Sequence, residues 1–221
     1  MITACLVPVK ELSTSMSRLG NILTQNEKIA LSLAMLEDVV EVVRGIEGIE
    51  PMVMVTRDPR AAAIAESYQV EVIREPEETR GEGPAVDYGA DILAGQGIDR
   101  LLVIPSDVPQ VAASDIEAIL GIDIGTPSVV MAPAHDGGTN AMLRRPTTAI
   151  PSRFGPNSLA LHLEEAEARS VATRIVRLES LYVDVDTPED MASVLTWNGP
   201  DRTRRFVESI GLAAKLPQPA G

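Results

Sequence analysis

Short apolar segments alternate with longer segments of helical hydrophobic spacing along most of the chain. The clearest apolar segment is RLLVIP at residues 100–105, and the clearest helical pattern covers residues 27–44. Strands that alternate with helices in this way indicate strand–helix–strand units and a mostly parallel sheet. Aromatic residues make up only 3% of the 221 residues, so aliphatic side chains must fill the core. We therefore expect an α/β fold of three layers, with helices covering both faces of the sheet.

The chain shows no internal repeat and no low-complexity linker, so we expect one domain over residues 1–221. A loose C-terminal arm is expected from about residue 199, with Pro217 and Pro219 near its end. Ser114, with Glu117 three residues later, is typical of a helix that starts with a capping box. The expected strands cover residues 2–9, 51–56, 70–74, 100–105, 128–132, 140–144, 175–178 and 182–185, and the expected helices residues 27–44, 59–68, 85–93, 114–120, 158–169 and 188–195.

The charge balance excludes one class of partner. The chain has 19 basic and 32 acidic residues and a net charge of −13, whereas nucleic-acid binding depends on neutralising phosphates with Lys and Arg. Cys5 is the single cysteine, so no internal disulfide can form. No apolar stretch approaches the ~18 residues of a membrane span, and the N-terminus does not resemble a secretion signal. We expect a cytoplasmic protein with no nucleic-acid or membrane partner.

Ligands of such sheets bind beyond the carboxyl ends of the strands, so the polar residues that follow each strand are the candidates. The loop after the first strand, at residues 8–20, contains Lys10, Arg18 and four hydroxyl side chains. These groups suit nucleotide phosphates, although the GxxxxGK[ST] spacing of a Walker loop is absent. An ordinary polar connection is the alternative.

Three carboxylates follow predicted strands. Asp107 comes directly after the most apolar strand, between two prolines, and suits a divalent cation that bridges phosphates, or alternatively a turn cap. Asp184 and Asp186 alternate with valines, which on an extended strand places both on one face. Because two such carboxylates repel each other, a shared cation is the simpler explanation. Thr187 and the following Pro-Glu-Asp then predict a helix start in which the acids are structural.

Two glycine-containing segments could surround an anion. Asp136-Gly137-Gly138-Thr139-Asn140 offers backbone N–H groups, a hydroxyl and an amide, and Phe154-Gly155-Pro156-Asn157-Ser158 leads into a helix whose first N–H groups are free. A tight turn and a helix cap are the alternatives. His135 and His162 are far apart in sequence, and no HExxH, CxxC, GxSxG or GxGxxG motif is present.

With these segments in order, the sequence resembles the 2-phospho-L-lactate guanylyltransferase family, including its bacterial branch that uses phosphoenolpyruvate. The matching segments are VPVKEL…SRLG, PSDVP, DGGTNAMLRRP, FGPNSLALHLEEA and DVDTPEDM, between residues 7 and 191. The resemblance implies a GT-A-like, Rossmann-like nucleotidyltransferase fold. It also implies Mg²⁺-dependent transfer of GMP from GTP to the phosphate of a small phosphorylated acid, with release of pyrophosphate, in deazaflavin coenzyme biosynthesis. The acid would be phosphoenolpyruvate, 2-phospho-L-lactate or 3-phosphoglycerate.

The resemblance also implies roles for individual residues. The metal ligands would be Asp107, Asp184 and Asp186; the acid would be bound by Thr139, Asn140, Gly155 and Ser158; and the nucleotide by Lys10, Arg18 and Gly83, with Asp107, Lys10 and Arg18 as catalytic residues. The chain departs from the family at Met16, where a Lys is usual, and at Glu82-Gly83-Pro84, where Leu-Asn is usual. A cytidylyl- or sugar-nucleotide transferase and a relative that only binds are the alternatives. The base, the acid and a homodimeric state stay open.

Overall fold

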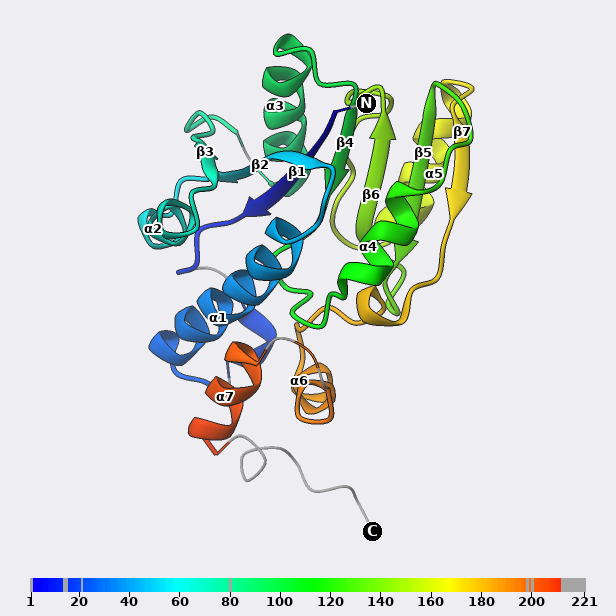
Figure 1. The fold of residues 1–221 in the computed structure, drawn as a ribbon. Helices are drawn as coiled ribbons and strands as arrows, with labels where there is room; N and C mark the ends of the chain where they lie inside the picture. Colours follow the sequence, from blue (N-terminus) through cyan, green and yellow to red (C-terminus); the bar gives the residue numbers. More distant parts are fainter. Residues whose placement is uncertain are drawn as a thin grey trace.

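A computed structural model of the chain describes residues 2–13, 16–20, 22–79, 81–197, 199 and 201–211. Its strands form a seven-stranded sheet in the order β3-β2-β1-β4-β6-β5-β7 (Figure 1). The strands are β1 (Thr3–Val9), β2 (Ile49–Thr56), β3 (Glu71–Ile73), β4 (Arg100–Val103), β5 (Ser128–Pro133), β6 (Thr139–Arg145) and β7 (Ala172–Ile175).

The sheet is mostly parallel, as predicted, with one exception. β1 pairs parallel with β2 and β4, β2 with β3, and β5 with β7, whereas β6 runs antiparallel to both of its neighbours. Val103, at the end of β4, pairs with Met142 of β6, so Thr139 at the start of β6 lies beyond the carboxyl end of β4. The antiparallel strand therefore brings its first residues to the edge of the sheet at which β1 and β4 end.

Helices cover both faces of the sheet because the strands are apolar on both sides (Figure 1). Cys5, Val7 and Val9 of β1 pack with α1, α2 and α4, while Ala4 and Leu6 point to the opposite face and pack with α3. α5 covers β5 on the α3 side of the sheet. The helices are α1 (Gln25–Arg44), α2 (Pro59–Ser67), α3 (Glu82–Gly95), α4 (Ala113–Leu120), α5 (Ser158–Ala168), α6 (Pro188–Val194) and α7 (Arg202–Ser209), with 3-10 turns η1 (Ser17–Leu19) and η2 (Glu179–Leu181).

Two predictions near the last strands are wrong. The final strand, β7, ends at Ile175 instead of beginning there, and residues 182–185 follow η2 without forming a strand. The reason is that this segment bonds to loops: Val185 N–H donates to the Asp107 carbonyl at 2.9 Å, and the Tyr182 carbonyl accepts from His135 N–H at 2.8 Å. Asp184 and Asp186 therefore do not alternate on an extended strand.

The predicted caps have different outcomes. α4 begins at Ala113 with no side-chain cap, so the box expected at Ser114 is wrong. The Ala112 N–H instead donates to Ser180 Oγ at 3.0 Å, because η2 lies against this end of the helix. Thr187 does cap α6, and Asp190 completes a capping box there, as the sequence indicated.

The beginning of the predicted C-terminal arm is anchored. Residues 201–211 include α7, which lies beside α1 (Figure 1). The buried Asp38 carboxylate of α1 accepts from Thr203 N–H at 2.9 Å and from Thr203 Oγ1 at 2.6 Å. Pro217 and Pro219 lie outside the described residues. Among the helices that the structure describes, none has both the length and the apolar character needed to cross a bilayer.

Candidate active site

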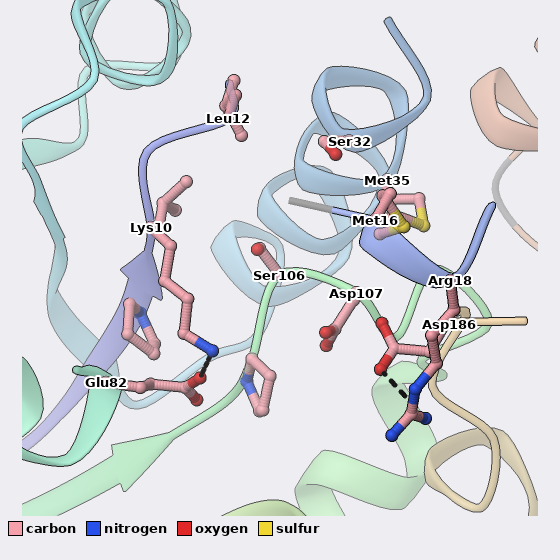
Figure 2. Close-up of a pocket in the computed structure, with 13 residues that line it drawn as sticks. Lys10, Leu12, Met16, Arg18, Ser32, Met35, Glu82, Ser106, Asp107 and Asp186 are labelled. Carbon is pink, nitrogen blue, oxygen red and sulfur yellow. Dashed lines mark ion pairs between the residues drawn. The ribbon is translucent and has the colours of Figure 1, made fainter. Parts of the chain in front are cut away.

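Two adjoining cavities open at the edge where β1 and β4 end. One has a volume of about 290 Å³ and extends towards α1, and the other, of about 400 Å³, extends towards the start of β6 and α5. Figure 2 shows the first cavity, with Lys10 and Glu82 on one side of Asp107 and with Asp186 and Arg18 on the other. The residues that line both cavities are Lys10, Arg18, Glu82, Pro105, Asp107 and Asp186.

The cavity towards α1 contains both basic residues predicted to bind nucleotide. Lys10 Nζ lies 2.8 Å from a carboxylate oxygen of Glu82, and an Arg18 nitrogen lies 3.7 Å from Asp186 (Figure 2). Burial lowers the pKa of Lys10, but the Glu82 carboxylate outweighs it, so the pKa is raised and the side chain stays charged. Met16 lines the same cavity and packs with Leu19 and Met35. We call this cavity the nucleotide half of the site.

The three predicted acids meet at the larger cavity, since Asp107, Asp184 and Asp186 all line it. The hydrogen bond from Val185 N–H to the Asp107 carbonyl joins the loop after β4 to the segment that carries the other two. Burial, followed by repulsion from Glu82, Asp184 and Asp186, raises the pKa of Asp107 to about 8. The site thus concentrates negative charge that a cation would relieve.

The chemistry of the three acids suits a magnesium ion. Within the described ranges, no three His, Cys, Asp or Glu side chains form a ready-made metal cluster. Magnesium, however, usually takes one or two protein carboxylates, and waters and substrate phosphates complete its shell. The oxygen-only donors and the raised pKa of Asp107 fit an ion of that kind, which would be shared with a bound triphosphate.

The β5–β6 turn meets the first turn of α5 at the other end of the larger cavity. The Leu159 N–H, in the first turn of α5, donates to the Gly137 carbonyl at 3.2 Å. The N–H groups of Gly137 and Gly138 donate inside the turn, to the Ala134 carbonyl and to Asp136 Oδ1. The predicted anion cradle of paired glycines is therefore not open, because its donors are occupied.

The second predicted cradle does retain free donors. Ser158 N–H donates to the Gly155 carbonyl at 3.1 Å, but the N–H groups of Gly155 and Asn157 have no acceptor among the described residues. Gly155 has φ +126°, a conformation that L side chains rarely adopt, with open space where a side chain would be. Both residues line the larger cavity. We call this end, with Thr139 and Ser158, the acceptor half, after the phosphorylated acid that is predicted to bind there and to accept the nucleotide.

Thr139, Asn140 and Ser158 are buried where they line the acceptor half. Ser158 Oγ donates to Thr139 Oγ1 at 3.1 Å. Asn140 has a different use from the predicted one: its Nδ2 donates to the Leu181 carbonyl at 3.0 Å and to Asp184 Oδ1 at 3.2 Å. The amide thereby fixes Asp184 and the segment after η2, so its direct interaction is with a predicted metal ligand.

Gly83 is the predicted site residue that the structure places apart from the others. A Cβ on Gly83 would lie 2.5 Å from the Ser152 carbonyl oxygen, and Gly83 is not among the described residues that line the two cavities. The glycine therefore allows α3 to approach the chain before α5. Its neighbour Glu82 is the residue that reaches the site, where it pairs with Lys10.

Sequence reasoning did not select Glu82 or His162 as site residues. His162 is fully buried, and its Nδ1 lies 3.1 Å from Thr139 Oγ1. One signal was available: His162 follows Ser158 by four positions, which places both on one face of a helix. For Glu82 there was no local signal, because two strands, β2 and β3, separate it from Lys10 in the chain and the contact depends on the packing of α3.

Comparisons with known proteins show which family the chain is similar to. The family described as "Guanylyl transferase CofC like" matches residues 3–220. A phosphoenolpyruvate guanylyltransferase of Rubrobacter xylanophilus is 35% identical over 193 residues, covering 87% of this chain and 93% of the relative. A 2-phospho-L-lactate guanylyltransferase of Methanothermobacter thermautotrophicus is 27% identical, covering 97% and 94%.

The fold is also shared with solved structures. A cytidylyltransferase of Leptospira borgpetersenii superposes with a TM-score of 0.63 at 13% identity, covering 100% of this chain and 98% of that one. The expectation of a nucleotidyltransferase-type α/β fold is thus confirmed. The family match over nearly the whole length supplies the activity class. This chain belongs to the CofC-like guanylyl transferase family.

Proposed function

We propose that the protein transfers GMP from GTP to the phosphate of a small phosphorylated carboxylic acid. The observation that carries this proposal is the continuity of the site. Basic side chains and carboxylates line both cavities, and the end of the larger cavity also presents uncharged donors to an anion. Asp107 lines both halves, so it lies where two phosphate-bearing substrates would meet.

The reaction needs positioning and charge neutralisation more than covalent help from the protein. A phosphate oxygen of the acid forms a bond to the α-phosphorus of GTP, while the bond from that phosphorus to the bridging oxygen breaks and pyrophosphate leaves. The attacking phosphate is already an anion, so no side chain has to remove a proton. Lys10 and Arg18 exchange Glu82 and Asp186 for the triphosphate, which places positive charge beside the leaving group.

Magnesium is part of the same proposal. Asp107, Asp184 and Asp186 would hold the ion, with Asn140 holding Asp184 in place. A bound Mg²⁺ neutralises phosphate oxygens and orients the triphosphate. The support is the chemistry of the donor set: its ligands are oxygens only, and burial together with repulsion from the neighbouring carboxylates raises the pKa of Asp107.

We propose phosphoenolpyruvate as the acid and deazaflavin coenzyme biosynthesis as the setting. The relative of Rubrobacter xylanophilus, at 35% identity, carries that substrate in its name, whereas the phospholactate enzyme is 27% identical. In the acceptor half, the free N–H groups of Gly155 and Asn157 suit an anionic group.

The test is a matrix of four nucleotides against three acids, read as pyrophosphate release and as product mass. GTP with phosphoenolpyruvate should give the highest kcat/KM, and 2-phospho-L-lactate and 3-phosphoglycerate should give less. Absence of pyrophosphate with every pair would reject the transferase. Preference for CTP would replace it with a cytidylyltransferase. Calorimetric binding of both substrates without product would indicate a relative that only binds.

A further inference from the structure

His162 lies under the acceptor half and contacts three of its parts. The imidazole is fully buried. Its Nδ1 lies 3.1 Å from Thr139 Oγ1, and its Nε2 lies 2.8 Å from the Arg153 backbone nitrogen. Its ring packs edge to face with the Phe154 ring, and the two ring centroids are 5.1 Å apart. Thr139 and Phe154 both line the cavity. One buried side chain thus joins β6 to the loop that precedes α5.

The contact with Arg153 determines where the ring carries its proton. A backbone N–H can only donate, so His162 Nε2 must accept and cannot carry a hydrogen. Burial, followed by the nearby Arg144 charge, lowers the pKa of His162 to about 4, so the ring is neutral at neutral pH. A neutral imidazole with a bare Nε2 carries its hydrogen on Nδ1. That hydrogen is donated to Thr139 Oγ1.

The direction of this hydrogen bond decides what Thr139 can offer a ligand. A hydroxyl oxygen accepts up to two hydrogen bonds and donates one. Thr139 Oγ1 accepts from His162 and from Ser158 Oγ, each at 3.1 Å, and within the described residues its own hydrogen has no acceptor. The opposite tautomer would take the Thr139 hydrogen and leave the pair of hydroxyls with none for the cavity.

We infer that His162 is a positioning residue that holds the Thr139 hydroxyl as a hydrogen-bond donor to the anion of the acceptor. This inference rests on the proposed function, which supplies the phosphorylated acid as the ligand. A hydroxyl that can only donate favours phosphate or carboxylate oxygens and disfavours ligand groups that must themselves donate. His162 would therefore help to select an anion without touching it.

The tautomer can be tested without any substrate. The chain contains two histidines, so nitrogen-detected ring spectra of the intact protein show two imidazoles, and the His162→Gln variant assigns one of them by its loss. We expect a protonated Nδ1 and a bare Nε2 at pH 7. A hydrogen on Nε2 would overturn the inference. This result does not depend on turnover, so it is separate from failure of the proposed transferase.

A matched pair of variants tests the consequence for binding. The Asn nitrogen of His162→Asn can replace the donor at Nδ1, whereas the longer Gln of His162→Gln can replace the acceptor at Nε2 and loses the donor to Thr139. We expect His162→Gln to raise KM for phosphoenolpyruvate about tenfold, with KM for GTP unchanged. His162→Asn should recover most of that loss. Both variants lose the ring, so the midpoint temperature of thermal unfolding should be lower in both.

A double-mutant cycle then separates positioning from general support of the fold. In a Thr139→Val background, which keeps the shape and removes the hydroxyl, His162→Gln should change KM for phosphoenolpyruvate less than twofold. A full tenfold effect in that background would overturn the inference. So would equal KM values for His162→Asn and His162→Gln, because a purely structural role follows stability and does not distinguish the two. If the enzyme shows no turnover, calorimetric affinity for phosphoenolpyruvate replaces KM in the same cycle.

Discussion

The nucleotide half and the acceptor half hold their polar side chains in opposite ways. The Lys10 and Arg18 side chains are 62% and 58% exposed, and each is paired with an acid. In the acceptor half, Thr139 and Ser158 are 3% and 1% exposed and His162 is fully buried, and their contacts are directed hydrogen bonds. The polar side chains of the nucleotide half therefore form exposed ion pairs, whereas those of the acceptor half are buried and fixed by hydrogen bonds.

Under the proposed function, this difference predicts how each half would recognise its ligand. Exposed ion pairs contribute only about 0–1 kcal/mol, so Lys10 and Arg18 can exchange carboxylates for phosphates at little cost. Buried hydrogen bonds are costly to leave unmade, at about 1–3 kcal/mol, so the acceptor half keeps its donors in place before a ligand arrives. We expect the nucleotide half to respond to charge changes and the acceptor half to changes in single hydrogen bonds.

The largest effect should come from Asp107, because it lines both cavities and is also a predicted metal ligand. Asp107→Asn should lower kcat by about 10²–10³-fold, because one charged element of the phosphoryl-transfer site is removed. Asp184→Asn, at a residue that lines only the larger cavity, should lower kcat by at least ~10²-fold. Steady-state kinetics at saturating Mg²⁺ would measure both. Asp99→Asn is the control, because Asp99 pairs with Arg145 at the far end of β6. A loss below tenfold for Asp107→Asn would remove it from the reaction centre.

The acceptor half should also give the protein a pH-dependent stability. Burial lowers the pKa of His162 from 6.5 to about 4, so between those values the unfolded chain binds a proton that the folded chain does not. Stability is therefore present above pH 6.5 and is lost as the pH falls towards 4. At about 1.4 kcal/mol per pH unit, the loss is about 3 kcal/mol.

Chemical unfolding at a series of pH values would measure this effect as the difference between wild type and His162→Gln. Between pH 6.5 and 4, the pH dependence of the unfolding free energy should correspond to about one fewer proton taken up on unfolding in His162→Gln. Thr139→Val leaves the imidazole in place and should keep the wild-type pH dependence. The same pH dependence in wild type and His162→Gln would show that the buried imidazole does not set it.

Lys10→Met tests the basic side chains that are predicted to bind the triphosphate. The loss of one charge-assisted contact to the triphosphate should raise KM for GTP by about 10–100-fold, with KM for the acid unchanged. Lys28→Met is the matched control, because Lys28 lies on α1 and is not among the residues that line the nucleotide half. An equal rise in both KM values would show that the halves are not separate.

The sheet and most helices could be predicted from the sequence, because their apolar periodicity is local. Residues such as Asp107 could also be predicted, since a carboxylate after a buried strand must lie at the ligand-binding edge. The stretch at residues 182–185 could not, because its valines alternate like a strand while its backbone bonds to the loop after β4. Hydrophobic periodicity indicates which side chains are buried, but it does not indicate the hydrogen-bond partners of the backbone. Here those partners come from distant segments of the chain.

The glycines show a second reason why prediction fails. Gly137 and Gly138 fit an anion cradle by composition, yet their N–H groups close the turn itself, while Gly155 retains a free donor. Gly83 matched a position on the nucleotide side but packs against Ser152. Which N–H is occupied depends on the neighbouring acceptor, and a sequence motif carries no information about that.

The smallest effect is expected for Glu82→Gln, which tests whether charge exchange at Lys10 describes the nucleotide half. A carboxylate oxygen of Glu82 lies 2.8 Å from Lys10 Nζ, so Glu82 would compete with the triphosphate for the Lys10 ammonium group. Because Lys10 is largely exposed, the pair is weak, and its removal should lower KM for GTP by about two- to fivefold without changing KM for the acid. Initial-rate measurements at low GTP would resolve this change, with Glu71→Gln on β3, which is not a cavity-lining residue, as the control. A tenfold rise in KM for GTP would instead mean that Glu82 itself binds the nucleotide, and that charge exchange does not describe this half of the site.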